Sequence, residues 1–295
     1  MATSNGDTPG GDAGDLGALT DRYARAGGPA ERMTAGLALA AGLSEKGRYL
    51  EAIRVLQEIA GAAAGPAQRA QVLRQQGWIH LRLSEYEKAY QLLGEALELL
   101  SAHNSLDLFQ VYYDIAWMFY RQGYLENARN YCDGARMVLE SLAGAPAEAV
   151  ARARVELLHI TALIDAAAGD HRAAAAGLAT EIEAHRGSGD DYRLCGACSK
   201  MASVLLAQGD VAGALRYQRQ AHEIAQRRGE DFRLALSHKN YGDIYYVIGD
   251  LERSLEHYRQ SRQLAQSLHN RLGEVFSGGG IGRVLCCRGD CPAAL

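Results

Sequence analysis

The feature that most constrains the fold is a self-similarity of the sequence at a step of 40 residues. Residues 191–194 (Asp-Tyr-Arg-Leu) return 40 positions later as Asp-Phe-Arg-Leu at 231–234, and Gly209-Asp210 returns at 249–250 and again at 289–290. Such a period is typical of a solenoid, in which one short unit cannot bury its apolar face alone and stacks on its neighbours. We therefore expect a chain built by repetition rather than around one closed core.

Each residue type within the repeat has a physical role. Gly249 can adopt the left-handed conformation that ends one helix, and Asp250 can cap the next helix by accepting from its free N–H groups. Gly242 and Ser254 are small, so two helices can cross closely there, and Tyr258 fills the space beside the crossing. The segment is therefore predicted to be a helical hairpin.

The pattern from residue 241 to residue 258 resembles the helix pair of the tetratricopeptide repeat (TPR) family. It has a large residue, Gly, Tyr, a Gly turn, a small residue and an aromatic residue in the same order. The 40-residue step, longer than the common step of about 34 residues, is similar to that of spindle-orientation adaptors, kinesin light chain and bacterial TPR regulators. The resemblance covers residues 30–295 and implies an all-α fold, a right-handed TPR superhelix.

The turns that join paired helices predict the number of repeats. The predicted turn residues are Gly47, Ser84, Gly123, Gly169, Gly209, Gly249 and Gly289. Successive turns lie 37, 39, 46, 40, 40 and 40 residues apart, which predicts about six complete hairpins and a truncated seventh.

These repeats divide the chain into a tail and a solenoid. Residues 1–28 are predicted to be a disordered N-terminal tail because of their polar, Gly-rich composition, within which 15–26 could form a short helix. Residues 29–295 are predicted to be the solenoid, ending mid-repeat. This end predicts a fragment of a longer protein or an array closed by a partner, and it allows self-association through the open C-terminal end.

Composition and charge exclude several classes of function. The net charge is −4 and the Arg residues are scattered, so no basic stripe indicates nucleic acid. The sequence has no apolar run of about 18 residues and no secretory signal pattern, so no membrane association is expected. Six Cys without a spaced framework fit a reducing, cytoplasmic compartment better than a secreted domain.

No motif builds a catalytic or metal centre. Cys195 and Cys198 form a Cys-x-x-Cys pair, which can be a redox couple or half a zinc site, but a βαβ context and a second ligand pair are missing. Cys198 falls at a packing position of the repeat, so a small buried hydrophobe is the favoured interpretation. Residues 288–290 (Arg-Gly-Asp) coincide with a repeat turn, and residues 278–282 lack the strand and Lys of a nucleotide loop. We expect no enzyme activity and no cofactor.

The remaining candidate site is the inner face of the array. TPR proteins bind extended peptides in a groove lined by the first helix of each pair, and the resemblance implies the same here. The groove residues implied by the family pattern are Arg74, Trp78, Arg82, Gln110, Tyr113, Trp117, Tyr120, Arg121, His159, Lys239, Asp243 and Tyr246. Trp78 and Trp117 are one repeat apart and are expected to be neighbours on one wall.

Two interpretations of these Trp residues remain open. Trp, Tyr and Arg dominate binding hot spots and Arg forks favour carboxylates, so a groove site implies an acidic peptide or one with a free C-terminal carboxylate. Alternatively, the rings pack between adjacent first helices as core, as an aromatic stripe at helical spacing commonly does.

Three functional hypotheses follow. The leading one is a non-catalytic protein–protein interaction scaffold, as the N-terminal part of a larger bacterial signalling protein. The second is a regulatory domain that senses a small molecule or peptide and controls an enzymatic or DNA-binding unit outside the sequence. The third, an enzyme or metalloprotein, would require bound metal or turnover.

Overall fold

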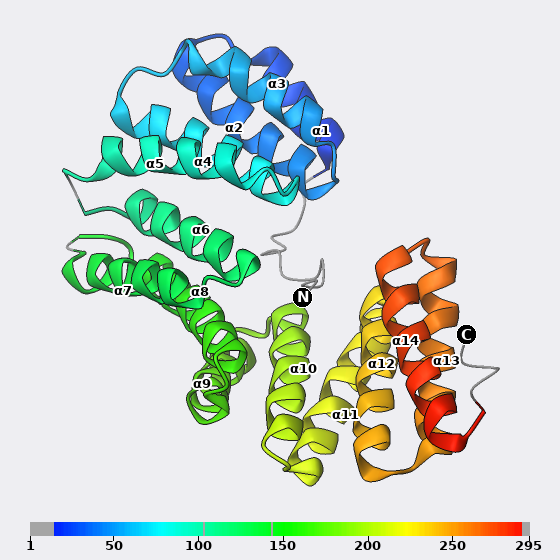
Figure 1. Cartoon of the computed structure of the whole chain (residues 1–295). Coiled ribbons are helices and arrows are strands. Elements are labelled where there is room, and N and C mark those ends of the chain that lie inside the picture. The colour runs from blue at the N-terminus through cyan, green and yellow to red at the C-terminus, as the bar shows by residue number, and fades with distance from the viewer. Residues whose placement is uncertain (1–14, 103, 143, 291–295) are drawn as a thin grey trace. The chain divides into compact units, whose positions relative to one another are not determined.

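The computed structural model describes residues 15–102, 104–142 and 144–290, which form helices joined by short connections (Figure 1). The helices are α1 (Leu16–Arg25), α2 (Pro29–Glu45), α3 (Tyr49–Ala60), α4 (Pro66–Arg82), α5 (Tyr86–Leu100), α6 (Leu106–Gln122), α7 (Leu125–Ser141), α8 (Ala147–Ala167), α9 (His171–Ser188), α10 (Asp191–Ala207), α11 (Val211–Arg228), α12 (Asp231–Ile248), α13 (Leu251–Ser267) and α14 (Arg271–Arg288). These ranges contain no strand, and the predicted all-α array of hairpins is confirmed.

The chain forms two compact units, and the boundary between them lies inside α8. Unit 1 is Met1–Ile160 and unit 2 is Thr161–Leu295. From α2 to α13 the described helices pair into the six predicted hairpins, and α14 begins the seventh. Residues 291–295, where the predicted truncation falls, lie outside the described residues.

The turns between paired helices have the predicted geometry. Every predicted turn residue has a positive φ, from 62° at Ser84 to 86° at Gly169 and Gly249. The residue that follows the glycine caps the next helix where it is Asp, since the Asp210 side chain accepts from Gly213 N at 2.8 Å and that of Asp250 from Arg253 N at 3.0 Å. One turn chemistry therefore recurs along the chain, and Ser84 adopts the left-handed conformation despite its side chain.

The predicted disordered tail is wrong for residues 16–25, which form α1, while residues 1–14 lie outside the described residues. The short helix expected within the tail is confirmed. Its Leu16, Leu19 and Tyr23 pack against the core of the first hairpin, and the Tyr23 hydroxyl donates to Glu58 Oε2 at 2.9 Å. Burial of these side chains, rather than helix propensity alone, explains why a ten-residue helix is stable here.

Trp117 belongs to the core of unit 1. It is 4% exposed, and its ring contacts those of Tyr113, Tyr120 and His159, with centroids 5.6–6.3 Å apart. Trp78, one repeat earlier, is only half-buried. The expected pairing of the two Trp rings on one open wall is therefore wrong: Trp117 supports the helix stack from inside, and Trp78 alone faces a cavity.

Unit 2 shows how closely the small residues allow helices to approach. A Cβ at Gly242 of α12 would lie 2.7 Å from the Tyr258 ring, and one at Gly280 of α14 would lie 2.4 Å from it. Tyr258 of α13 is fully buried, and Ser254 Oγ donates to the Gly242 carbonyl at 2.8 Å. The close crossing predicted at Gly242 and Ser254 is confirmed, and the ring of Tyr258 lies between two helices that meet it with glycine.

Three histidines that are dispersed in the sequence meet in unit 2. His238 Nδ1 and His257 Nδ1 are 3.0 Å apart, and the His222 ring lies against the His238 ring with centroids 5.1 Å apart. Tyr241 and Tyr245 stack on His257. Burial is the main cause that lowers the pKa of all three imidazoles, and it lowers the pKa of His238 to about 4.

The described helices include none that combines the length and the apolar character needed to cross a membrane.

The burial of Trp117 leads to a prediction about stability. Trp117→Ala should lower the free energy of unfolding by about 3–5 kcal/mol, because it leaves a cavity in a packed core. Trp78→Ala, which removes a half-buried ring from the edge of a cavity, should cost clearly less. Thermal melting followed by circular dichroism compares the two variants, and equal losses would place Trp117 outside the core.

A second prediction compares two adjacent glycines of α14. Gly280→Ala should destabilise the protein by about 1–3 kcal/mol, because the new methyl group collides with the buried Tyr258 ring. Gly279→Ala meets nothing within 4 Å and should stabilise the helix by about 1 kcal/mol. Urea unfolding measures both, and a stabilising Gly280→Ala would contradict the close approach of α14.

The histidine cluster leads to a prediction about pH. The folded chain keeps these imidazoles neutral below their ordinary pKa near 6.5, whereas the unfolded chain protonates them. The unfolded state therefore binds more protons between pH 6.5 and about 4, and stability falls as the pH drops through this window. His238→Gln should lose about 1–2 kcal/mol less than the wild type between pH 7 and pH 5 in urea unfolding. Parallel losses would show that His238 titrates normally in the folded chain.

Candidate functional site

The first helices of successive hairpins lie next to one another in each unit. In unit 1, α4 contacts both α2 and α6, and in unit 2, α12 contacts both α10 and α14. Side chains on the exposed faces of these helices therefore line a surface that crosses several repeats. Each unit carries one cavity on this surface, and the two differ in charge.

The cavity of unit 1 has a volume of about 220 Å³ and lies among α2, α4, α6 and the first part of α8. Arg74, Trp78, Gln110 and Tyr113, all predicted groove residues, line it. Its position on the first helices agrees with the prediction. Its charge does not, because three carboxylates that the sequence did not single out line it as well.

These carboxylates belong to Glu45, Asp114 and Glu156. Arg74 Nη1 is 3.0 Å from Asp114 Oδ2, so the guanidinium that was expected to bind a ligand carboxylate already has one. Gln110 Nε2 donates to Glu156 Oε2 at 3.1 Å. With one guanidinium against three carboxylates, the charge balance of the cavity disfavours an acidic ligand.

Burial affects the charge state of the cavity. The Asp114 side chain is 4% exposed, and burial raises the pKa of this carboxyl to about 6, against the opposing effect of Arg74 and with a smaller contribution from Glu156. Burial also raises the pKa of Glu45. The carboxylates are thus held in surroundings that favour their neutral forms until a further positive charge is present.

The other predicted residues of unit 1 do not line this cavity. Arg82 Nε donates to the Tyr49 hydroxyl at 3.4 Å, and Arg121 Nη1 donates to the Leu81 carbonyl at 3.3 Å, so both side chains connect repeats. Tyr120 and His159 contact the buried Trp117. These residues support the structure behind the cavity wall.

The cavity of unit 2 has a volume of about 590 Å³ and lies among α10, α12 and α14. Lys239, Asp243 and Tyr246, all predicted groove residues, line it together with Phe276 and Arg283. Phe276 is exposed to solvent, as is Val247 beside it in the lining. The cavity therefore combines an apolar wall with charged groups, a composition typical of ligand sites.

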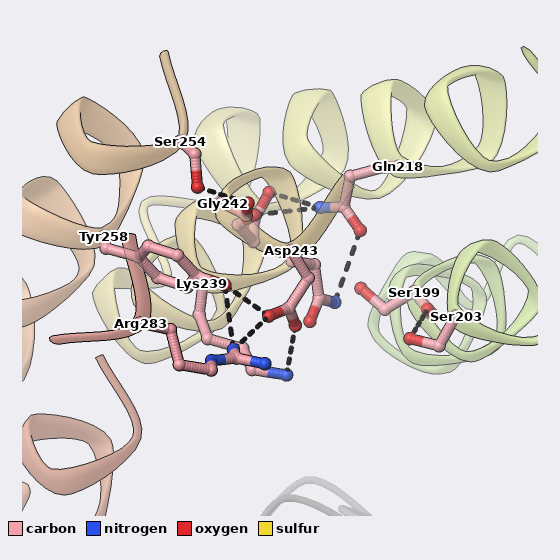
Figure 2. Close-up of polar contacts among 11 residues, drawn as sticks. Ser199, Ser203, Gln218, Lys239, Gly242, Asp243, Ser254, Tyr258 and Arg283 are labelled. Atoms are coloured by element: carbon pink, nitrogen blue, oxygen red, sulfur yellow. Dashed lines mark hydrogen bonds and ion pairs between the residues drawn. The ribbon is translucent and has the colours of Figure 1, made fainter. Parts of the chain in front are cut away.

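Asp243 is at the centre of the polar contacts in this cavity (Figure 2). Lys239 Nζ lies 2.7 Å from Asp243 Oδ2, and Arg283 Nη2 lies 3.1 Å from Oδ1, to which the Tyr258 hydroxyl also donates. The Arg283 guanidinium also lies over the Tyr246 ring, 5.3 Å from its centroid. Two cations share one carboxylate, and the Arg283 side chain remains 55% exposed, so this cavity carries a surplus of positive charge.

A signal in the sequence could have identified the missed residues. Arg74 and Asp114 are 40 positions apart, and so are Asp243 and Arg283. Charged residues of opposite sign one period apart on first helices are placed side by side by the stacking itself. Pairing the charges by the repeat period would have indicated Asp114 and Arg283, whereas Glu156 is 46 positions from Gln110, its partner across the longer step.

Cys195 and Cys198 lie in the core of unit 2, as the packing interpretation predicts. Cys195 Sγ donates to the Ala221 carbonyl at 3.3 Å. Burial raises the pKa of both thiols, that of Cys198 to about 12. A thiol held in its neutral form is a poor nucleophile and a poor metal ligand.

Comparison of the sequence with family models gives one match. Residues 192–267, which run from α10 to the end of α13, match the model of the tetratricopeptide repeat family. Comparison with curated proteins gives no match.

Solved structures with the same fold cover most of the chain. A signal transduction ATPase with numerous domains from Pyrococcus horikoshii, with a tetratricopeptide repeat sensor, is 15% identical and has a TM-score of 0.68, over 92% of this chain and 42% of its own. Aspartyl phosphate phosphatase F from Bacillus subtilis is 13% identical with a TM-score of 0.68, over 90% and 68%. A Rap protein in complex with competence and sporulation factor is 11% identical with a TM-score of 0.62, over 94% and 80%.

These likenesses show the fold, and the present chain spans less than half of the archaeal ATPase. Together, the match over residues 192–267 and the shared helical fold identify the chain as a tetratricopeptide repeat protein.

Proposed function

We propose that this protein is a non-catalytic interaction module that binds a peptide or a segment of a protein along its first helices. The observation that carries the proposal is the cavity of unit 2, which opens between three successive first helices and combines exposed apolar side chains with a surplus of positive charge. An extended segment can place a side chain in each repeat of such a surface.

The ligand of unit 2 is a peptide with an acidic side chain or a free C-terminal carboxylate next to an apolar residue. The exposed Arg283 guanidinium offers N–H donors beyond those used for Asp243, and a guanidinium fork suits a carboxylate. Phe276 and Val247 supply an apolar surface for the neighbouring side chain. The carboxylate preference expected from the sequence is thus proposed for unit 2, where Lys239 and Arg283 outnumber Asp243.

The non-catalytic part of the proposal is supported by the way the charged groups are used. In both cavities the cations and carboxylates are tied to one another across repeats, as in Arg74–Asp114 and Arg283–Asp243. The proposal places the protein in the cytoplasm, where a reducing environment suits free buried thiols such as Cys132, Cys195 and Cys198.

A sensing role in a larger signalling protein is the second candidate. It is favoured by the likeness to the Pyrococcus ATPase, whose tetratricopeptide repeats are described as a sensor, and to a Rap protein in complex with a factor. Thermal-shift screening with small molecules separates the two candidates from each other: stabilisation by a small molecule and not by any peptide favours the sensor.

The peptide proposal is tested with Arg283→Glu. Binding of fluorescent acidic peptides with a free carboxyl terminus, measured by anisotropy, should weaken at least tenfold in this variant and should decline with added salt. Arg262→Glu makes the same charge change at an exposed position of α13 outside the cavity and should bind as the wild type does. Equal affinities of the two variants, or no peptide binding to the wild type at all, would refute the proposal.

A further inference from the structure

We infer that the cavity of unit 1 is a binding site for an alkyl cation, an ammonium or guanidinium group such as the side chain of a lysine or arginine in a bound peptide. This inference rests on the proposed function, since it names the ligand chemistry of one of the two grooves. It reverses the acidic preference that the sequence suggested for these residues.

The first observation is the excess of negative charge. Glu45, Asp114 and Glu156 reach the cavity from three different helices, α2, α6 and α8. The one cation of the lining, Arg74, is held by Asp114 at 3.0 Å and is 25% exposed. A second cation that enters the cavity would meet two further carboxylates in partly desolvated surroundings, where their attraction is stronger than in water.

The second observation is the aromatic lining. The half-buried Trp78 indole and the Tyr113 ring lie on two adjacent first helices and border the same cavity. Aromatic faces attract cations through the ring quadrupole, and indole does so most strongly. Carboxylates combined with aromatic walls are selective for a positive group on an apolar chain, because the alkyl part packs on the rings while the charged end reaches the carboxylates.

The third observation is the presence of two buried polar atoms without a partner in the described structure. Gln75 donates from Nε2 to the Leu37 carbonyl at 3.2 Å, but its Oε1 accepts no hydrogen bond. Arg74 Nε, on the same cavity wall, donates to no acceptor. A bound lysine or arginine residue offers a donor for the first atom and a main-chain carbonyl for the second, which fits a cation carried by a peptide.

The cavity size is consistent with a single side chain. About 220 Å³ is less than half the volume of the cavity in unit 2, and the open side faces solvent across the first helices. One long side chain can enter while the peptide backbone remains at the surface.

The test uses the full chain and the peptide acetyl-Ala-Lys-Ala-amide, with the matched peptide that carries norleucine in place of lysine. Titration calorimetry should show saturable binding of the lysine peptide, and the norleucine peptide should bind at least tenfold more weakly. Glu156→Gln keeps the shape of a half-buried side chain while removing one charge, and it should weaken the lysine peptide at least tenfold. Glu98→Gln, on the outer helix α5, is the control that should bind as the wild type does.

A proton measurement distinguishes the site from general electrostatic attraction. The groups that face Asp114 are Arg74 from α4, Glu45 from α2 and Glu156 from α8. An added cation lowers the pKa of Asp114 from about 6, so binding at pH 6 should release protons, and the binding enthalpy should depend on the ionisation enthalpy of the buffer. Asp114→Asn should abolish this buffer dependence.

Three results would decide against the inference: equal binding of the lysine and norleucine peptides, unchanged affinity in Glu156→Gln, or an enthalpy independent of buffer. Cadaverine, a free diamine, separates the two sources of the cation. If it binds with the same dependence on Glu156 and the lysine peptide does not, the cation chemistry stands and the peptide source is refuted. Arg283→Glu should leave the lysine peptide unaffected, so failure of the acidic-peptide proposal remains distinguishable from failure of this one.

Discussion

The rest of the structure depends on how closely neighbouring helices approach where one of them carries a small residue. The ring of Tyr258 can be fully buried in unit 2 because Gly242 and Gly280 present no side chain to it. In unit 1, Gly77 has the same role, since a Cβ there would lie 2.8 Å from Leu93 Cγ. The left-handed turns bring paired helices together, and these glycines set the distance at which they pack. Because this spacing recurs with the repeat, side chains one period apart on first helices become neighbours.

The ion pairs between repeats are a direct consequence of this spacing. Arg74 meets Asp114 and Arg283 meets Asp243, each 40 positions apart, although no local motif links the two members of either pair. An ion pair of this kind is half-buried at the groove surface and depends on the stacking register. It gives each groove a fixed charged centre around which the remaining charges decide the ligand preference.

Sequence reasoning was accurate where a feature depends on local backbone chemistry. The positive φ at the predicted turns and the caps by Asp210 and Asp250 follow from residue type alone. It failed where surroundings decide. Trp78 and Trp117 share a register position, but Trp117 has aromatic neighbours at Tyr113 and Tyr120, whereas Trp78 has Arg74 and Arg82 one turn away on either side. The aromatic neighbours enclose the first ring in the core, and the charged neighbours keep the second at the surface. The buried Asp114 was missed because a carboxylate on a helix is normally read as solvent-exposed.

The two grooves show that one repeat geometry can support opposite ligand charges. In unit 1 the Arg74–Asp114 pair leaves Glu45 and Glu156 in excess, and in unit 2 Asp243 cannot balance both Lys239 and Arg283. Neither preference follows from the fold, since the first helices and their spacing are alike. What differs is which charges remain after each pair between repeats has formed. The repeat period therefore determines where a ligand can lie along the first helices, and the unbalanced charges determine the sign of the group that binds there.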